Sequence, residues 1–170
     1  MKKILYFITI SILFTAFSCS DDDSAAYRDI GFGYCVVDQD GNDLFDQETA
    51  GAIDTSAIEI YNIIDGKPVL FRTNTGHKGY WFVKHEDSDG DGRYDNIPGL
   101  VMYIAILTYF DEEDKSTSII KWNKQESDTV TILADRKINS TWPVHYWVNG
   151  SDNIDWINKD LRIARKVKQR

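Results

Sequence analysis

Residues 79–109 constrain the fold most strongly, because they contain two strand-like segments separated by an acidic loop. In residues 79–86, side chains alternate between two faces, as they do in a strand. Residues 100–109 are apolar on both faces, which is typical of a strand covered on two sides. A short buried helix is the alternative. The β-branched and aromatic content, with a Pro-Gly pair just before the segment, favours a strand.

Further segments with short strand patterns lie on both sides of this stretch, at residues 30–37, 57–62, 68–72, 117–122, 128–134 and 144–148. Asp65 and Gly66 separate two of them and are a strong signal for a two-residue hairpin turn. Near the C-terminus, apolar residues in 154–164 have helical spacing, whereas those in 161–168 alternate. We expect a final edge strand over 161–168, with lysines that discourage edge-to-edge pairing, and a solvated basic tail over 165–170.

This succession of short segments, without a convincing long helix, predicts an all-β fold. We expect a single β-sandwich of about 7–8 strands, immunoglobulin-like or prealbumin-like, over residues 30–170. A closed barrel is the alternative. A chain of 170 residues is long enough for one domain with a sizeable core, and 42% apolar residues exclude a disordered protein. We expect Trp81, Trp122 and Trp147 to contribute to the core.

Residues 1–18 are typical of a secretory signal peptide. Lys2 and Lys3 precede an apolar run over residues 4–17, and small residues stand three and one before a cleavage position that leaves Cys19 first. The apolar run is too short to be a comfortable permanent span. Removal of this segment changes the formal net charge from −8 to −10.

The sequence Ala-Phe-Ser-Cys at residues 16–19 resembles the lipobox of bacterial lipoproteins, although the usual leucine is an alanine here. Ser-Asp-Asp-Asp at residues 20–23 is similar to the acidic surface-export signal of Bacteroidetes lipoproteins. The resemblance implies covalent lipid, such as palmitate, on Cys19 and a lipidated acidic tether over residues 19–29. Several acyl chains give stable anchoring where one chain gives only marginal binding. The implied location is the outer membrane, facing the cell surface, with a periplasm-facing orientation as the alternative.

The acidic loop over residues 87–95 resembles the calcium loops of EF-hands, dockerins and thrombospondin type 3 repeats. The matching positions are Asp87, Asp89 and Asp91 as alternating ligands, Gly92 as the turn glycine, Arg93 through its carbonyl, and Asp95 at the ninth position. Pro98 occupies the twelfth position, where those loops have a bidentate glutamate. The resemblance therefore implies a weak Ca²⁺ site, and a solvated acidic turn is the alternative.

A second acidic segment over residues 38–46 is a looser echo of the same pattern, with Asp38, Asp40, Asn42, Asp43 and Asp46. We interpret it mainly as a loop after the first strand, with a metal site as the alternative. The segment is also similar to a pattern near the N-terminus of small Bacteroidetes lipoproteins of unknown function. Residues 121–130 and 146–150 extend that similarity, which implies no activity.

Other chemistry-bearing residues give weaker signals. Without a partner cysteine after lipidation of Cys19, Cys35 is expected to be a buried apolar side chain rather than a catalytic thiol. Three histidines on separate segments do not favour a zinc site. No nucleophile elbow, phosphate loop or dinucleotide motif is present in the sequence. Trp142 and Trp156 are candidates for a sugar-stacking platform, with partly buried boundary tryptophans as the alternative.

The function class follows from charge and targeting. A net charge of −8 argues against nucleic acid and against direct adsorption to anionic lipid. We expect a non-enzymatic lipoprotein that is an accessory or binding domain with a protein or glycan partner, attached to the membrane through its lipid. A carbohydrate-binding module of a polysaccharide-uptake system is the alternative, followed by a small hydrolase. Exposed coplanar aromatics beside a groove, with Trp142 and Trp156 side by side, would favour the carbohydrate-binding module.

Overall fold

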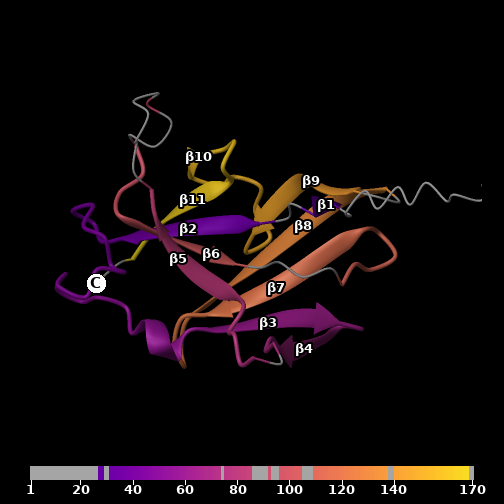
Figure 1. Ribbon diagram of the computed structural model, residues 1–170, viewed down its shortest axis with the longest axis horizontal. Coiled ribbons are helices and arrows are strands. Elements are labelled where there is room, and N and C mark those ends of the chain that lie inside the picture. The colour runs from indigo at the N-terminus through magenta and orange to yellow at the C-terminus, as the bar shows by residue number, and fades with distance from the viewer. Residues whose placement is uncertain are drawn as a thin grey trace, which may run out of the picture.

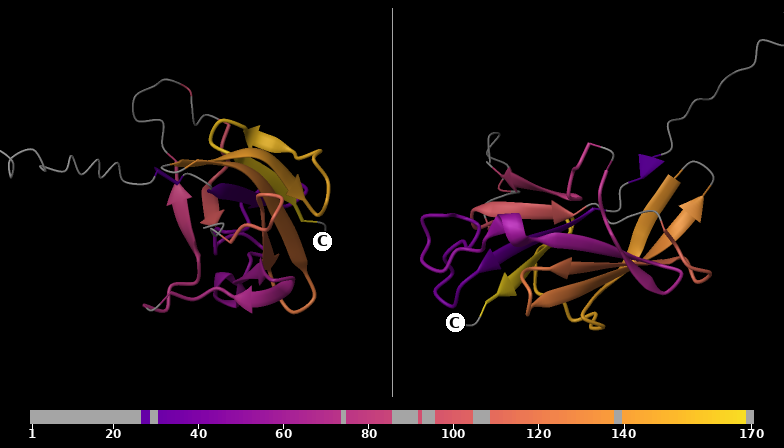
Figure 2. Two further views of the ribbon diagram at one scale, coloured as in Figure 1. Left: turned by 90° about the vertical axis from the view of Figure 1, so that its right-hand side faces the viewer. Right: turned by 90° about the horizontal axis from the view of Figure 1, so that it is seen from below.

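The chain folds as two packed β-sheets in the computed structural model, which describes residues 27–28, 31–73, 75–85, 92, 96–104, 109–137 and 140–168. Figures 1 and 2 show the two layers from three sides. This arrangement confirms the predicted β-sandwich and excludes the closed barrel, although the described residues form eleven strands instead of about 7–8. The described part contains one short 3-10 helix, η2 (Thr55–Ala57). No helix within it is long and apolar enough to cross a membrane.

One sheet has six strands in the order β1-β9-β8-β7-β3-β4. Their bounds are β1 Tyr27–Arg28, β9 Ser140–Val148, β8 Ser127–Lys137, β7 Lys115–Lys121, β3 Glu59–Ile64 and β4 Lys67–Leu70. The other sheet has five strands in the order β10-β11-β2-β6-β5. Their bounds are β10 Trp156–Asn158, β11 Ile163–Val167, β2 Phe32–Val37, β6 Leu100–Ile104 and β5 Tyr80–Lys84. Most neighbouring pairs are antiparallel, but β1 is parallel to β9 and β11 is parallel to β2.

The predicted hairpin between β3 and β4 is confirmed. Asp65 and Gly66 have φ values of 50° and 72°, and positive φ at both central residues is what a type I′ turn requires. The predicted β5–β6 pair is also present, with Trp81 opposite Tyr103 and Val83 opposite Val101. This pair lies at one edge of its sheet, with β5 as the edge strand. The strand of this sheet in which every residue is buried is β2, which lies between β11 and β6.

The main core lies between the two sheets. Residues at alternate positions of β7 and β8 face inward, so Ile120, Val130 and Ile132 are fully buried. From the opposite sheet, Phe32 and Met102 pack against the same cluster. Burial of large side chains of this kind contributes about 1.5–3 kcal/mol each.

A second, smaller cluster lies on the other face of the five-stranded sheet. It contains Cys35, Val101 and Ile163, with Tyr103 and Leu161 packed against them. Gly33 makes room for this cluster, because a Cβ there would lie 2.9 Å from Val101 Cγ1. Since this cluster covers the second face of β2, its all-buried sequence is explained.

The C-terminal strand corrects two expectations. Strand β11 is present, as the alternation predicts, but it lies between β10 and β2 rather than at an edge. The side chain of Lys166 in β11 is only 18% exposed and pairs with Asp128 of β8 and with Glu126 in the turn just before β8. The prediction that residues 165–170 form a solvated tail is therefore wrong for Lys166.

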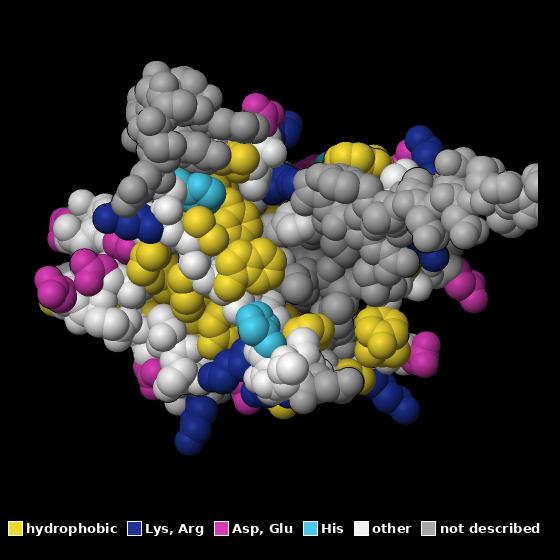
Figure 3. All heavy atoms as spheres, in the orientation of Figure 1, with side chains coloured by type: hydrophobic (Ala, Val, Ile, Leu, Met, Phe, Trp, Pro, Cys, Tyr) yellow, Lys and Arg dark blue, Asp and Glu magenta, His cyan; other side chains and the backbone are white. Residues whose placement is uncertain are grey.

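Three short or peripheral features also differ from the predictions. Tyr27–Arg28 pairs with β9 as β1, so strand pairing begins before residue 30. Strand β10 has no counterpart among the predicted strands. Trp122 is buried as expected, but Trp81 is 43% exposed, because it lies on the outward face of edge strand β5. Hydrophobic side chains gather over β5 on the face that Figure 3 shows.

Candidate functional site

A hollow of about 390 Å³ lies where the edge of β9 meets the β10–β11 segment. It is lined by Trp142, Pro143, Val144, Tyr146, Trp156, Lys159, Asp160 and Arg162. The two tryptophans singled out as a sugar-stacking platform therefore line the same hollow. In Figure 1 the β10–β11 turn lies beside β9, so residues distant in the sequence meet here.

Strand β9 exposes Trp142 because of its pairing. Strand β1 pairs only with Ser140 and Thr141, so the rest of this edge of β9 is not covered by β1. Thr141 is buried, and the next residue, Trp142, points outward and is 44% exposed. An exposed tryptophan ring at the rim of a hollow offers a large apolar surface for contact with a ligand.

Trp156, in contrast, is held in the core boundary by two other aromatic rings. Its ring centroid is 5.7 Å from that of Phe32 and 5.7 Å from that of Tyr146, both in edge-to-face geometry. Phe32 and Tyr146 are themselves 5.6 Å apart. Edge-to-face contacts of this kind fix ring orientation. One tryptophan of the hollow is therefore exposed, and the other is half-buried and fixed in orientation.

The polar wall of the hollow comes from the turn between β10 and β11. Leu161 N donates to Asn158 Oδ1 at 3.0 Å, and Arg162 N donates to the Lys159 carbonyl at 3.1 Å. The Arg162 carbonyl then accepts from Gly33 N at 3.0 Å, which ties the turn to β2. Lys159, Asp160 and Arg162 therefore project from a backbone that is fixed by hydrogen bonds.

These polar residues were missed in the sequence. The signal available was the polar run Asn-Lys-Asp at residues 158–160 between two short apolar stretches. Such a run marks a turn, but it does not show which surface the turn adjoins. The sequence places Tyr146 in the predicted strand over residues 144–148, but its role as the support for Trp156 depends on the pairing of β9.

The predicted calcium ligands Asp87, Asp89, Asp91, Arg93 and Asp95 lie outside the described residues, as does the predicted lipidation site Cys19. The turn glycine of the calcium loop, Gly92, is described and has a φ of 73°. Among the residues that are described, no group of three or more His, Cys, Asp or Glu side chains is placed to hold a metal ion.

The second acidic segment, residues 38–46, is described and forms a set of side-chain-capped turns. Asp38 Oδ1 accepts from the backbone N–H groups of Asp40 and Asn42, both at 2.9 Å. Asp43 Oδ2 accepts from Leu100 N at 2.8 Å, and Asp46 Oδ1 caps a separate turn. These carboxylates stabilise different backbone turns instead of converging, which supports the loop interpretation over a metal site.

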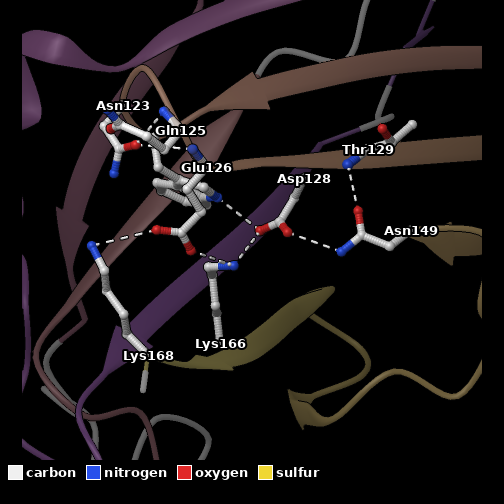
Figure 4. Close-up of polar contacts among 9 residues, drawn as sticks. Asn123, Gln125, Glu126, Asp128, Thr129, Asn149, Lys166 and Lys168 are labelled. Atoms are coloured by element: carbon white, nitrogen blue, oxygen red, sulfur yellow. Dashed lines mark hydrogen bonds and ion pairs between the residues drawn. The ribbon is translucent and has the colours of Figure 1, made fainter. Parts of the chain in front are cut away.

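A buried polar network, also missed in the sequence, joins the two sheets at the side of β8 (Figure 4). Asp128 is 4% exposed and accepts from Trp122 Nε1 at 2.7 Å and from Asn149 Nδ2 at 2.9 Å. Lys166 Nζ lies 2.8 Å from Asp128 Oδ2 and 3.1 Å from Glu126. Because β8 and β11 belong to different sheets, the ion pair links the two layers.

The same network influences a buried tyrosine. Tyr34 is 2% exposed, and its hydroxyl has no hydrogen-bond partner among the residues that the structure describes. Burial, together with the negative charge of Asp128, raises the pKa of Tyr34 well above its usual value. The phenol therefore stays neutral, and its ring packs edge-to-face on Trp122 at 5.6 Å. We assign the network a structural role.

Cys35 behaves as the sequence predicts. It is fully buried on the outer side of β2, and it is a free thiol. Burial, and to a smaller extent the nearby charge of Asp43, raise its pKa to about 12. A thiol of this kind is a poor nucleophile at neutral pH.

Two other surfaces are weaker candidates for a ligand site than the hollow lined by Trp142 and Trp156. A larger hollow of about 510 Å³ lies beside the β3–β4 turn, with Asp65, Asp111, Glu112 and Lys115 in its wall. The Asp111 carboxylate there is occupied by two backbone N–H groups. On β5, exposed Trp81 stacks on Tyr103 with ring centroids 5.9 Å apart. Cross-strand pairing accounts for that contact.

Comparison with known proteins adds no assignment, because no family model, no curated protein and no solved structure matches this chain. The class of protein therefore rests on the fold and the site themselves: a β-sandwich with an aromatic, partly polar hollow at one strand edge.

Proposed function

We propose that this protein is a non-enzymatic lipoprotein of the outer membrane, facing the cell surface, whose β-sandwich binds glycans in the hollow between Trp142 and Trp156. The observation that carries the proposal is that these two tryptophans, 14 positions apart in the sequence, line one hollow. The hollow volume of about 390 Å³ lies within the usual range for small-ligand sites.

The chemistry of the hollow suits a sugar ring. A pyranose has an apolar face of C–H groups that packs on an aromatic ring, and a rim of hydroxyl groups that needs hydrogen-bond partners. Trp142 offers the exposed ring, and Trp156 a ring held by Phe32 and Tyr146. The polar side chains of the β10–β11 turn offer charged donors and acceptors for hydroxyl groups.

The experiment uses the mature lipoprotein in detergent and affinity electrophoresis through soluble galactan, glucan, xylan and polygalacturonate. We expect at least one polysaccharide to retard the protein, and Trp142→Ala to weaken binding about 5- to 30-fold. That factor corresponds to about 1–2 kcal/mol for one face of a tryptophan. Trp156→Phe should weaken binding less, because it keeps an aromatic ring in the site.

Trp81→Ala is the matched control, since Trp81 is 43% exposed and Trp142 is 44% exposed, but Trp81 lies on β5. The control variant should bind as the unaltered protein does. Absence of retardation by every polysaccharide, or equal losses in both alanine variants, would refute glycan binding at this hollow.

The anchoring half of the proposal rests on the sequence at residues 16–23. We expect Cys19→Ser to abolish membrane association, because several acyl chains on one residue provide the stable anchor. Replacement of Asp21, Asp22 and Asp23 by alanine should keep the lipid but reduce protease access on intact cells. A Cys19→Ser protein that stays in the membrane fraction contradicts the lipid anchor. Unchanged protease access in the triple variant would contradict the surface-export role of these aspartates and leave only the lipid anchor.

A further inference from the structure

The hollow between the two tryptophans differs from its surroundings in charge. Lys159 and Arg162 contribute two positive charges to its wall, and Asp160 contributes one negative charge. The whole chain carries a net charge of −8. By comparison, the hollow beside the β3–β4 turn has three acidic residues and one lysine. A locally basic wall in an acidic protein favours an anionic ligand over a neutral one.

Lys159 is available for such a ligand. It is exposed at the rim of the hollow, and its ammonium group takes part in no ion pair within the described part of the chain. Six other described lysines and arginines do pair with carboxylates, as Lys115 does with Glu113. The Lys159 charge therefore has no structural role that those contacts reveal.

Arg162 adds an independent observation. Four described non-glycine residues have positive φ, and three of them are Asp65, Asp114 and Asn149. Asp and Asn tolerate this left-handed conformation, whereas the fourth, Arg162 at 57°, has a long side chain that disfavours it. An unfavourable backbone conformation that is kept at a ligand-lining arginine directs attention to the function of its side chain.

We propose that the hollow selects acidic glycans, and that Lys159 and Arg162 bind the carboxylate or sulfate group of a sugar whose ring packs on Trp142. The inference rests on the proposed glycan-binding function and adds the ligand class. Arginine suits this role because its planar guanidinium forms paired hydrogen bonds with a carboxylate or a sulfate.

The test compares three probes of one chain length: a neutral galactan oligosaccharide, an oligogalacturonate and a sulfated galactan oligosaccharide. Isothermal titration of the mature lipoprotein should give at least one anionic probe an affinity about 3- to 10-fold higher than that of the neutral probe. Added NaCl should reduce this preference, because exposed charges are screened. Whether the uronate or the sulfate is favoured identifies the acidic group.

Two variants assign the preference to this turn. Arg162→Gly removes the guanidinium but suits a positive φ, so the turn keeps its backbone conformation while the anionic preference falls. Lys159→Met should also reduce the preference without a change in melting temperature. Lys124→Met, an exposed lysine in the β7–β8 turn, is the matched control and should keep it.

The outcomes separate the two proposals. If neutral and anionic probes bind equally well and Trp142→Ala weakens both, the acidic selectivity is wrong and glycan binding stands. If the preference survives in both Arg162→Gly and Lys159→Met, these residues do not provide it, and the inference is overturned. If no probe binds while glucan or xylan retards the protein in electrophoresis, the acidic selectivity is wrong and glycan binding stands.

Discussion

The network around Asp128 makes the most direct prediction about stability. Asp128→Ala removes a carboxylate that is 4% exposed and accepts hydrogen bonds from Trp122 and Asn149. It also removes the nearer acidic partner of Lys166, at 2.8 Å. Because these partners come from both sheets, the substitution should destabilise the packing of one layer on the other.

The expected magnitude follows from the groups left behind. The Trp122 ring N–H would remain buried without an acceptor, since Trp122 is 1% exposed, and an unsatisfied buried donor costs about 1–3 kcal/mol. Loss of one partner of a fully buried ion pair costs about 3–5 kcal/mol. Lys166 keeps Glu126 at 3.1 Å and is 18% exposed, so the cost here should be lower. We expect about 2–4 kcal/mol in total, or a fall in Tm of roughly 4–16 °C.

Urea unfolding followed by tryptophan fluorescence measures this loss, with the m value checked for constancy. Asp135→Ala is the matched control, because Asp135 lies on the same strand but forms an exposed pair with Lys137 at 3.2 Å. The control should change stability by less than about 0.5 kcal/mol. If both variants lose the same stability, the buried network does not contribute as we argue. A double-mutant cycle with Lys166→Met should show coupling of about 0.5–3 kcal/mol.

Two further predictions concern Cys35 and the acidic loop. The Cys35 thiol is fully buried and its pKa is raised to about 12. A disulfide reagent at about pH 8 should therefore label it only after denaturation. Equal labelling of the native protein would contradict the burial. For the loop over residues 87–95, about 10 mM Ca²⁺ should raise Tm by roughly 3–10 °C relative to NaCl of equal ionic strength, since a site with a Kd of about 10⁻⁴–10⁻³ M stabilises by mass action. Asp89→Ala and Asp91→Ala should each remove most of this shift, and the control variant Asp46→Ala should keep it. Equal melting temperatures in the two salts would mean that the loop is a solvated acidic turn.

Local pattern was sufficient for much of the fold. The β3–β4 hairpin was predictable because Asp65 and Gly66 alone specify the turn type. Strands β7 and β8 alternate between a buried and a less buried face, so their period was visible in the sequence. In these elements each residue is placed by its neighbours in the chain.

Non-local pairing was beyond what local pattern contains. The parallel pairing of β11 with β2 joins residues at opposite ends of the domain. The lysines of residues 161–168 suggested an exposed edge, but Lys166 is instead compensated by Asp128 and Glu126 from distant segments. A charged side chain can occupy an interior strand when a partner satisfies it, and the sequence does not show which partner that is.

The candidate site depends on one irregularity that the sequence also concealed. In a regular strand Trp142 and Tyr146, four residues apart, would point to the same face. Strand β9 has a bulge at Val144, because Leu133 pairs with His145 and Ala134 pairs with Pro143. The extra residue shifts the alternation, so Trp142 lies opposite exposed Asp135 while Tyr146 lies opposite buried Ile132.

This shift is what allows one strand to provide both parts of the hollow. Tyr146 points inward and supports Trp156 through their ring contact at 5.7 Å, while Trp142 points outward and is 44% exposed. The bulge breaks the period of two, so only residues 144–148 of β9 show a strand pattern in the sequence, and Trp142 lies outside the predicted strand. The bulge at Val144 therefore has two effects: it interrupts the strand pattern in the sequence, and it turns the Trp142 side chain toward the proposed binding surface. Bulges beside functional sites commonly reorient a side chain in this way.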